Sequence, residues 1–400
     1  MKNYAIIAEY NPFHFGHLYQ INMIRKMDPK AVIIVIISTF FVQRGEPSYL
    51  DPKFKTASAL KNGADLVLAL PSIYSLQSAE HFAYGAVSIL NRFKHIDHLV
   101  FGAESDYSEL YNFARFQMDH ALSIDEKRIE FMKEGLNFNQ GLIKACCAIA
   151  DENDMKISQD LFQSNNILAL EYIKSLMKLK SSISAISIKR SGQRYNDTEI
   201  LEEKLPSATA IRKHFKEAPG KVKNILPNES YSGLIQSRFI DKNTLFDLIK
   251  YKLIIESIPL ETITGFEQGL SGHLRKNLMK SSSYDEFIEN STTSRYRKNR
   301  IQRFIINMLL DNKKVFIDQS IREIPEWVRV LGFNKKGQDF LHSSKNESDM
   351  IFLTQYKQYN ALSDFGKKQF DKEVDSCNLY YFSKDNFGDY FRQIPIIIKD

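Results

Sequence analysis

The residues best suited to chemistry lie close to the start of this sequence. A strand-like segment, Tyr4–Ala8, leads into a turn that contains Pro12 and then into an H-x-G-H pattern at residues 14–17. Pro12 disfavours helix at the residue before it, so we expect a helix to begin at or just after the pattern. The first turn of a helix has unpaired N–H groups that attract phosphate. His14 and His17, three residues apart on that turn, would each donate a hydrogen bond to a phosphate oxygen.

Gly16 lies between the two histidines and, having no Cβ, would let a base or ribose approach the backbone. A capped helix with two surface histidines is the alternative interpretation of the same residues. The pattern directly follows the first strand of an alternating strand and helix sequence, and ligands of open parallel sheets bind at the carboxyl ends of strands. This position favours a nucleotide-binding site.

A second pattern of the same kind, S-A-T-A-I-R, occupies residues 207–212. Pro206 precedes it, Ser207 is of a type that commonly caps helices, and Arg212 adds a planar, permanently charged donor. We therefore predict that a helix begins at Ser207 and that Ser207, Thr209 and Arg212 contact phosphate. An ordinary capped helix is the alternative.

Apolar runs of strand length alternate with helical patterns through the first half of the chain, as is typical of a parallel sheet covered on both faces. The predicted strands are Tyr4–Ala8, Ala31–Ser38, Leu66–Leu70, Leu99–Phe101 and Ile183–Ile188, and the predicted helices include His17–Met27, Pro52–Asn62, Gln77–Phe93 and Ile167–Leu179. Beyond Pro219 the predicted helices are Tyr231–Ile258, Ile263–Lys280, Tyr284–Ile288 and Thr293–Leu310, with strand-like pieces at Leu379–Phe382 and Ile394–Ile398. The sequence thus predicts an α/β fold, with a Rossmann-like parallel-sheet domain over residues 1–218 and a mainly helical region over residues 219–400.

Composition limits the classes of protein to which the chain can belong. Its 400 residues are 43% hydrophobic and 26% charged, as in an ordinary soluble globular protein. The three cysteines form neither a zinc pattern nor a disulfide framework, and no apolar run approaches the roughly 20 residues of a membrane span. A reducing, cytoplasmic setting is therefore expected. No cluster of acidic residues has the pattern of a dedicated metal site.

The net charge of +6 lies entirely in the second half of the chain. Residues 1–200 hold 22 basic and 22 acidic side chains, whereas residues 201–400 hold 32 and 26. A predicted basic helix, Ser294–Arg303, would suit phosphate contacts that position an RNA, with an aromatic side chain available for stacking. The candidate RNA-binding residues are Arg295, Tyr296, Arg297, Lys298, Arg300 and Arg303. A solvated charged face is the alternative.

Longer matches accompany the H-x-G-H pattern. They are EYNPFHFGHLYQ (9–20), FVQRGEP (41–47), ALKNGADLVLALP (59–71), SAEHFAYGAVSIL (78–90), FGAES (101–105), SNNILALEYI (164–173) and SATAIRK (207–213). With them the chain resembles, over nearly its whole length, the bacterial tRNA(Met) cytidine acetate ligases of the H-x-G-H nucleotidyltransferase superfamily. Similar enzymes make acetyl-adenylate from acetate and ATP, then acetylate N4 of the wobble cytidine of elongator tRNA(Met). One departure is Tyr195-Asn196-Asp197, where Tyr-His-Asp is expected.

The resemblance implies that elongator tRNA(Met), ATP and acetate are the partners, with Mg²⁺ commonly accompanying ATP in similar enzymes. It implies that His14, His17 and Arg212 are catalytic. The implied ATP-binding residues are Ile7, Ala8, Glu9, Tyr10, Asn11, Pro12, Phe13, His14, Phe15, Gly16, His17, Leu18, Tyr19, Gln20, Gly102, Asn165, Arg190 and Ser191, joined by Ser207 and Thr209 of the second pattern. A small-molecule nucleotidyltransferase and a non-catalytic RNA-binding protein on this fold are the alternatives.

The residues themselves give some support to these sites. Gly102 ends a strand and permits close approach of a nucleotide, although a tight turn would also need it. Asn165 and Asn166 precede a predicted helix and offer amides that can read an adenine edge, although one asparagine could simply cap it. Arg44, after the second strand, would bind acetate or phosphate, or form a structural pair with Glu46.

Overall fold

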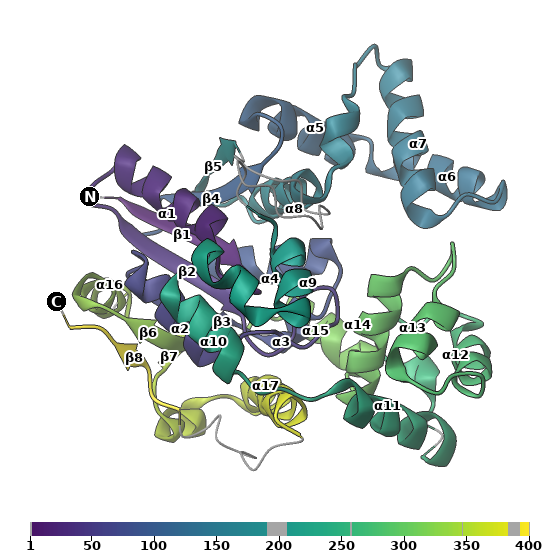
Figure 1. Ribbon diagram of the computed structural model, residues 1–400. Helices are drawn as coiled ribbons and strands as arrows, with labels where there is room; N and C mark the ends of the chain where they lie inside the picture. Colours follow the sequence, from purple (N-terminus) through teal and green to yellow (C-terminus); the bar gives the residue numbers. More distant parts are fainter. Residues whose placement is uncertain (1, 190–205, 257, 346, 383–392, 400) are drawn as a thin grey trace.

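The computed structural model describes residues 2–189, 206–256, 258–345, 347–382 and 393–399 (Figure 1). Within these residues the centre of the molecule is an eight-stranded sheet in the order β5-β4-β1-β2-β3-β6-β7, with β8 paired to β6. Its first five strands are β1 (Asn3–Ala8), β2 (Val32–Ser38), β3 (Leu66–Leu70), β4 (His98–Ala103) and β5 (Ser184–Lys189). All neighbouring pairs among these five are parallel. The five predicted strands and the predicted α/β class are confirmed.

The two faces of the sheet are covered by different helices because successive side chains of each strand point to opposite faces. On one face Ile6, Val35 and Val67 pack with helices α1 (Phe15–Met27) and α2 (Pro52–Lys61). On the other face Ile34 and Leu68 pack with α4 (Ala79–Asn91), α8 (Ser164–Lys178) and α16 (Lys335–Lys345). Every residue of β2 is buried, which is why its sequence is an unbroken apolar run.

The strand order reverses direction at β1. The chain places β2 and β3 on one side of β1, then returns to place β4 and β5 on the other side. In open α/β sheets ligands typically bind where the strand order reverses, which here is at the carboxyl ends of β1 and β4. The H-x-G-H pattern follows β1, and Gly102 lies within the end of β4.

The region after residue 218 is not only helical. Strand β6 (Trp327–Phe333) pairs antiparallel with β3, and β7 (Ile351–Leu353) and β8 (Ile396–Ile397) pair with β6. The strand-like piece Leu379–Phe382 was predicted wrongly, because its first residues end helix α17 (Asp364–Tyr380), which buries Phe370, Cys377 and Tyr380. The last part of the chain thus adds strands to the sheet formed by the first part. The division into two domains at residue 218 stays a prediction.

Of the helices predicted after Pro219, Tyr231–Ile258, Ile263–Lys280 and Thr293–Leu310 are shorter in the structure, whereas Tyr284–Ile288 extends to Ser291. The observed helices are α10 (Asn228–Gln236), α11 (Lys242–Lys250) with a π-helical turn (Tyr251–Ile255), α12 (Leu270–Leu278), α13 (Tyr284–Ser291), α14 (Lys298–Leu309) and α15 (Lys314–Arg322). The predicted helix Tyr231–Ile258 is divided because Asp241 caps a new helix, its side chain accepting from the backbone N–H groups of Asn243 and Thr244. Helices α11 to α14, here called the helical bundle, share a core with Phe40, Phe41 and Leu76 of the sheet domain.

The remaining helices are α3 (Ser72–Ser75), α5 (Tyr107–Asp119), α6 (Ala121–Lys133), α7 (Phe138–Glu152) and α9 (Ala208–Glu217), with 3-10 turns at Gln159–Phe162, Pro219–Ile225, Leu260–Thr262 and Tyr356–Ala361. Figure 1 shows α6 and α7 as a pair that projects from the body, while α9 lies between the sheet and the bundle. Among the described residues, no helix is both long and apolar enough to cross a membrane.

Candidate nucleotide-binding site

His14 is the N-cap residue of α1. Its backbone is extended (φ −140°, ψ 173°), and its Nδ1 accepts a hydrogen bond from the backbone N–H of Gly16 at 3.0 Å. A Cβ on residue 16 would lie 2.8 Å from Cε1 of His14. Gly16 therefore makes room for the ring of His14, and the approach of a base or ribose there stays a prediction.

The two histidines form a reciprocal cap. Nδ1 of His17 accepts from the backbone N–H of His14 at 3.2 Å, and the two rings stack with centroids 3.8 Å apart. Because Nδ1 of each ring is an acceptor here, the neutral form of each ring has its proton on Nε2. Each Nε2–H is then a donor beside the positive end of α1, as a phosphate-binding site requires.

The residues between β1 and α1 mainly hold this cap in place. Tyr10 has a left-handed backbone (φ 46°), and Tyr10 and Phe13 are buried, with the Tyr10 ring packing edge-on against that of His17. Asn11 is also buried and does not cap α1, because its Oδ1 accepts from the backbone N–H of Tyr49 at 2.7 Å. The implied ATP contacts Ile7, Ala8, Tyr10, Asn11, Pro12 and Phe13 are buried, whereas Glu9 and Phe15 to Gln20 are partly exposed.

The second pattern meets the first through Arg212. Ser207 caps α9 as predicted, its Oγ accepting from the backbone N–H of Ala210 at 3.0 Å. One turn later, Nη1 of Arg212 donates to the carbonyl oxygen of Asn11 at 2.7 Å, and Nη2 donates to Oγ1 of Thr209 at 3.3 Å. This contact between residues 201 positions apart joins the two patterns that are predicted to bind phosphate, near the carboxyl end of β1.

The asparagine pair has a different place from the one expected. Asn165 and Asn166 lie inside the first turn of α8, which begins at Ser164, rather than before it. Asn166 is fully buried, and its Oδ1 accepts from the backbone N–H groups of Glu104 and Ser105, so it cannot read an adenine. Asn165 donates to Oε1 of Glu104 at 2.5 Å and stays beside the end of β4.

Glu104 lies at this edge of the sheet and is not among the predicted site residues. It follows Gly102 by two positions, and its carboxylate accepts from Asn165 and from the backbone N–H of Asn166. A carboxylate fixed beside a strand end can accept from a ribose hydroxyl. Its position two residues after a strand-ending glycine is the signal that could have found it.

The loop after β2 connects the site to the helical bundle. The backbone N–H of Gln43 donates to Glu9 at 2.6 Å, which ties the loop to the end of β1. Gln302 of α14 donates from Nε2 to Glu46 at 3.0 Å, and Arg303 donates to the carbonyl oxygen of Gln43 at 3.3 Å. Burial lowers the pKa of Arg303 to about 10, with the nearby Arg300 and Arg44 adding to the effect.

The predicted basic helix is only partly a helix. Residues 294–297 precede α14, which begins at Lys298. Arg295 and Arg300 form ion pairs with Glu267, and Tyr296 is 6% exposed and packs against the ring of His273. Tyr296 is therefore not available to stack on a base, and a sequence window could not show this because Glu267 and His273 lie 20 to 30 residues away. Arg297 and Lys298 are exposed.

Lys55 is a second residue that the sequence did not single out. Its side chain is fully buried, and Nζ donates to the carbonyl oxygens of Ser38 and Thr39 at the end of β2. Burial lowers the pKa of this lysine to about 7, against opposing effects of Glu9 and Asp51.

Two of the implied ATP-binding residues, Arg190 and Ser191, lie outside the described residues. Within the described part, no group of three His, Cys, Asp or Glu residues could hold a metal ion.

Comparison with known proteins shows the family of this chain. A model of the HIGH Nucleotidyl Transferase family matches residues 1–392. The chain belongs to this family. Among similar relatives, the tRNA(Met) cytidine acetate ligase of Thermoanaerobacter sp. is 35% identical over 96% of this chain and 95% of its own. That of Clostridium perfringens is 35% identical over 94% of each chain.

Solved structures of similar chains extend the comparison to the fold of this HIGH nucleotidyl transferase. The structure of Thermotoga maritima TmcAL without ligand has a TM-score of 0.92 at 28% identity, and each chain is covered completely. TmcAL bound with alpha-thio ATP has a TM-score of 0.91 at the same identity and coverage. A chain of the same fold therefore binds an ATP analogue.

Proposed function

We infer that this HIGH nucleotidyl transferase activates acetate with ATP and transfers the acetyl group to N4 of the wobble cytidine of elongator tRNA(Met). The relatives named tRNA(Met) cytidine acetate ligase, which match over nearly the full length of both chains, support this activity. The main structural support for this activity is the contact of Arg212 with the carbonyl oxygen of Asn11. Through this contact the N-terminus of α1, capped by the two histidines, and the N-terminus of α9 lie near the end of the same strand, β1. Two helix N-termini and a guanidinium then surround one place for a triphosphate.

The first half-reaction is catalysed by positioning and by electrostatics. An acetate oxygen attacks the α-phosphorus of ATP in line, and the bond to the pyrophosphate oxygen breaks. Negative charge that develops on the phosphates meets the Nε2–H groups of His14 and His17, the guanidinium of Arg212 and the backbone N–H groups of both helix ends. Neither histidine acts as a nucleophile. ATP enters as a substrate, and Mg²⁺ would accompany its phosphates.

The second half-reaction needs an RNA at the same edge of the sheet. The helical bundle contacts the loop after β2 through Gln302 and Arg303, so a polyanion bound to the bundle reaches the carboxyl ends of the strands. The exposed Arg297 and Lys298 offer phosphate contacts beside that loop. The mixed anhydride must also be protected from water while it persists, which a docked RNA would achieve.

The test is conversion of labelled ATP to AMP with acetate, with and without unmodified elongator tRNA(Met), followed by mass spectrometry of the RNA nucleosides. Formation of N4-acetylcytidine that depends on ATP and acetate is the expected result. AMP release without RNA acetylation would point to another acceptor, including that of a small-molecule nucleotidyltransferase. No turnover of ATP would leave a binding protein on this fold.

A further inference from the structure

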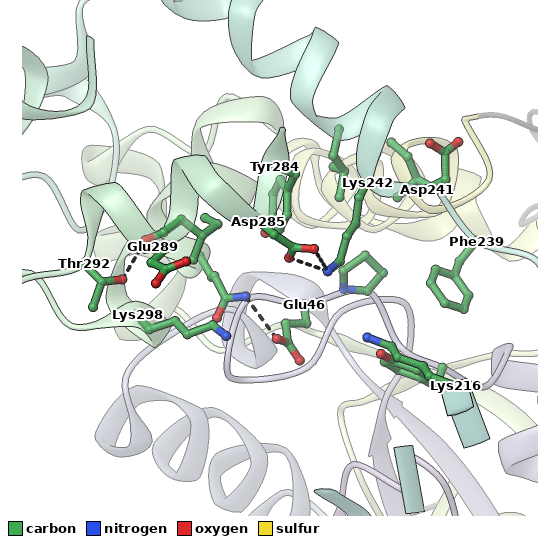
Figure 2. A pocket seen from close by; sticks show the side chains of 16 residues that line it. Glu46, Lys216, Phe239, Asp241, Lys242, Tyr284, Asp285, Glu289, Thr292 and Lys298 are labelled. Atoms are coloured by element: carbon green, nitrogen blue, oxygen red, sulfur yellow. Dashed lines mark hydrogen bonds and ion pairs between the residues drawn. The ribbon is translucent and has the colours of Figure 1, made fainter. Parts of the chain in front are cut away.

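A cavity of about 620 Å³ lies between the loop after β2 and the helical bundle, outside the triphosphate site (Figure 2). Its lining comes from that loop (Glu46, Pro47, Tyr49), from α9 (Lys216) and from the bundle, including Lys242, Tyr284, Asp285, Glu289, Lys298 and Gln302. This volume is in the range of small-molecule sites and exceeds what acetate requires. No step of the adenylation reaction uses these side chains.

The cavity adjoins the proposed triphosphate site at Tyr49. Tyr49 lines the cavity, and its backbone N–H donates to Asn11 in the turn before α1. Arg212 and Lys216, one turn apart on α9, both lie against the Tyr49 ring, at 5.7 and 5.5 Å from its centre. Arg212 also contacts Asn11, whereas Lys216 lines the cavity. A group bound in the cavity would therefore lie close to the residues that we propose hold the triphosphate.

The charges of the cavity favour a neutral ligand with hydrogen-bond donors over a free anion. Four acidic side chains line it, and Asp285 is engaged by Lys242. One oxygen of Glu46 accepts from Gln302 at 3.0 Å, and Figure 2 shows Glu46 between Lys298 and Lys216. An ionised carboxylate only accepts hydrogen bonds, so its second oxygen would repel acetate or a phosphate but would attract an exocyclic amine. The flanking lysines suit the phosphates on either side of a nucleoside.

We propose that this cavity holds the acceptor cytidine, flipped out of its RNA, with the Glu46 carboxylate accepting a hydrogen bond from the N4 amino group. Acceptance of the cytosine N4 hydrogens is the base-edge contact that Glu and Asp typically make, and uracil presents an acceptor, O4, at the same position. Glu46 thereby distinguishes cytidine from uridine. This inference rests on the proposed transfer to a cytidine and assigns the residue that reads its base.

The same contact gives Glu46 a part in the transfer. N4 attacks the acetyl carbonyl carbon of the acetyl-adenylate, a C–N bond forms, and the bond from that carbon to the phosphate oxygen breaks with its electron pair leaving on AMP. One N4 proton passes to the Glu46 carboxylate and then to solvent. General-base assistance of this type contributes about 10²- to 10⁴-fold to a rate.

The test separates the two half-reactions in the full chain. Acetate-dependent exchange of pyrophosphate into ATP, measured without RNA, reports adenylation, and single-turnover formation of N4-acetylcytidine reports transfer. Glu46→Gln keeps an acceptor for Gln302 and should retain the exchange rate within about twofold, while transfer falls about 100-fold or more. Asp247→Asn removes a charge from α11 outside the cavity, where Asp247 pairs with Lys250, and should change neither rate.

A second readout tests the reading of the base. A tRNA(Met) transcript with uridine at the wobble position should inhibit acetylation weakly in the natural protein and about tenfold more strongly in Glu46→Gln, because a glutamine amide can donate to O4. Transfer at the natural rate in Glu46→Gln, or loss of exchange together with transfer, would overturn the proposal. A natural protein that shows no acetate-dependent exchange would instead overturn the proposed function itself.

Discussion

Nη1 of Arg212 lies 2.7 Å from the carbonyl oxygen of Asn11, and this hydrogen bond joins helix α9, which carries the S-A-T-A-I-R pattern, to the turn that precedes the H-x-G-H pattern. We propose two roles for the guanidinium. One of its nitrogens fixes the position of the histidine turn relative to α9, and its charge stays beside the place where phosphates would lie. A lysine could supply the charge but not the planar fork.

Arg212→Lys should therefore lower acetate-dependent pyrophosphate exchange by about 10²-fold, as loss of a preorganised donor does in other active sites. Arg238→Lys is the matched control, because Arg238 also donates to backbone carbonyl oxygens but lies outside the site. Exchange by Arg212→Lys at the rate of the control would show that the guanidinium is not needed in adenylation.

The helix cap that His14 forms and its proposed phosphate contact can be separated by a substitution that keeps the cap. Aspartate is among the best N-cap residues, so His14→Asp should retain the acceptor for the backbone N–H of Gly16. It also places a negative charge where phosphate would bind. We expect its thermal midpoint to match the natural protein, while His14→Ala loses about 1 kcal/mol of unfolding free energy.

Both His14 variants should lose adenylation, measured as AMP formed with acetate and ATP. Helix capping alone would predict a different pattern, in which His14→Asp stays active and only His14→Ala is impaired. Retained activity in His14→Asp would therefore assign this histidine a structural role and remove it from the catalytic residues.

The sequence predicts the parallel half of the fold well because its strands are unbroken apolar runs with clear turns between them. It does not predict β6, whose seven residues include Arg329 and follow a long helical stretch. It correctly places the two histidines at the start of a helix, but it does not show that Gly16 makes room for the ring of His14. The sequence also wrongly predicts that Tyr296 is available for stacking on a base. Tyr296 is buried against His273 of α12, and the spacing of nearby residues cannot show how α12 packs.

Lys55 should make stability depend on pH. Burial lowers its pKa to about 7 in the folded protein from an ordinary value of 10.5. Between these two values the unfolded chain binds the proton and the folded chain does not, so unfolding free energy should rise with pH across this window. The rise attributable to this group is at most about 1.4 kcal/mol per pH unit.

Lys55→Met should flatten that dependence in denaturant titrations at pH 7.5, 8.5 and 9.5. Lys53→Met is the control, because Lys53 is exposed on the same helix and should leave the slope unchanged. Equal slopes in all three proteins would show that Lys55 stays protonated in the fold.

RNA binding by the predicted basic helix leads to different predictions for two of its arginines. Arg297 is exposed and lies at the start of α14, whereas Arg295 forms an ion pair with Glu267 at a hydrogen-bond distance of 2.7 Å from its Nε. An arginine that contacts an RNA phosphate adds about 0.7 to 0.9 to the slope of log affinity against log salt concentration. Arg297→Gln should therefore lower tRNA affinity and reduce this slope by about that amount.

Arg295→Gln should change the slope less, because binding a phosphate through Arg295 would first require its separation from Glu267. Filter binding of tRNA(Met) between 50 and 300 mM salt compares the two variants directly. If Arg297→Gln leaves the slope unchanged while Arg295→Gln lowers it, the RNA contacts the side of the bundle that carries Glu267. The proposed RNA contact at Arg297, which leads toward the cavity at Glu46, would then be wrong.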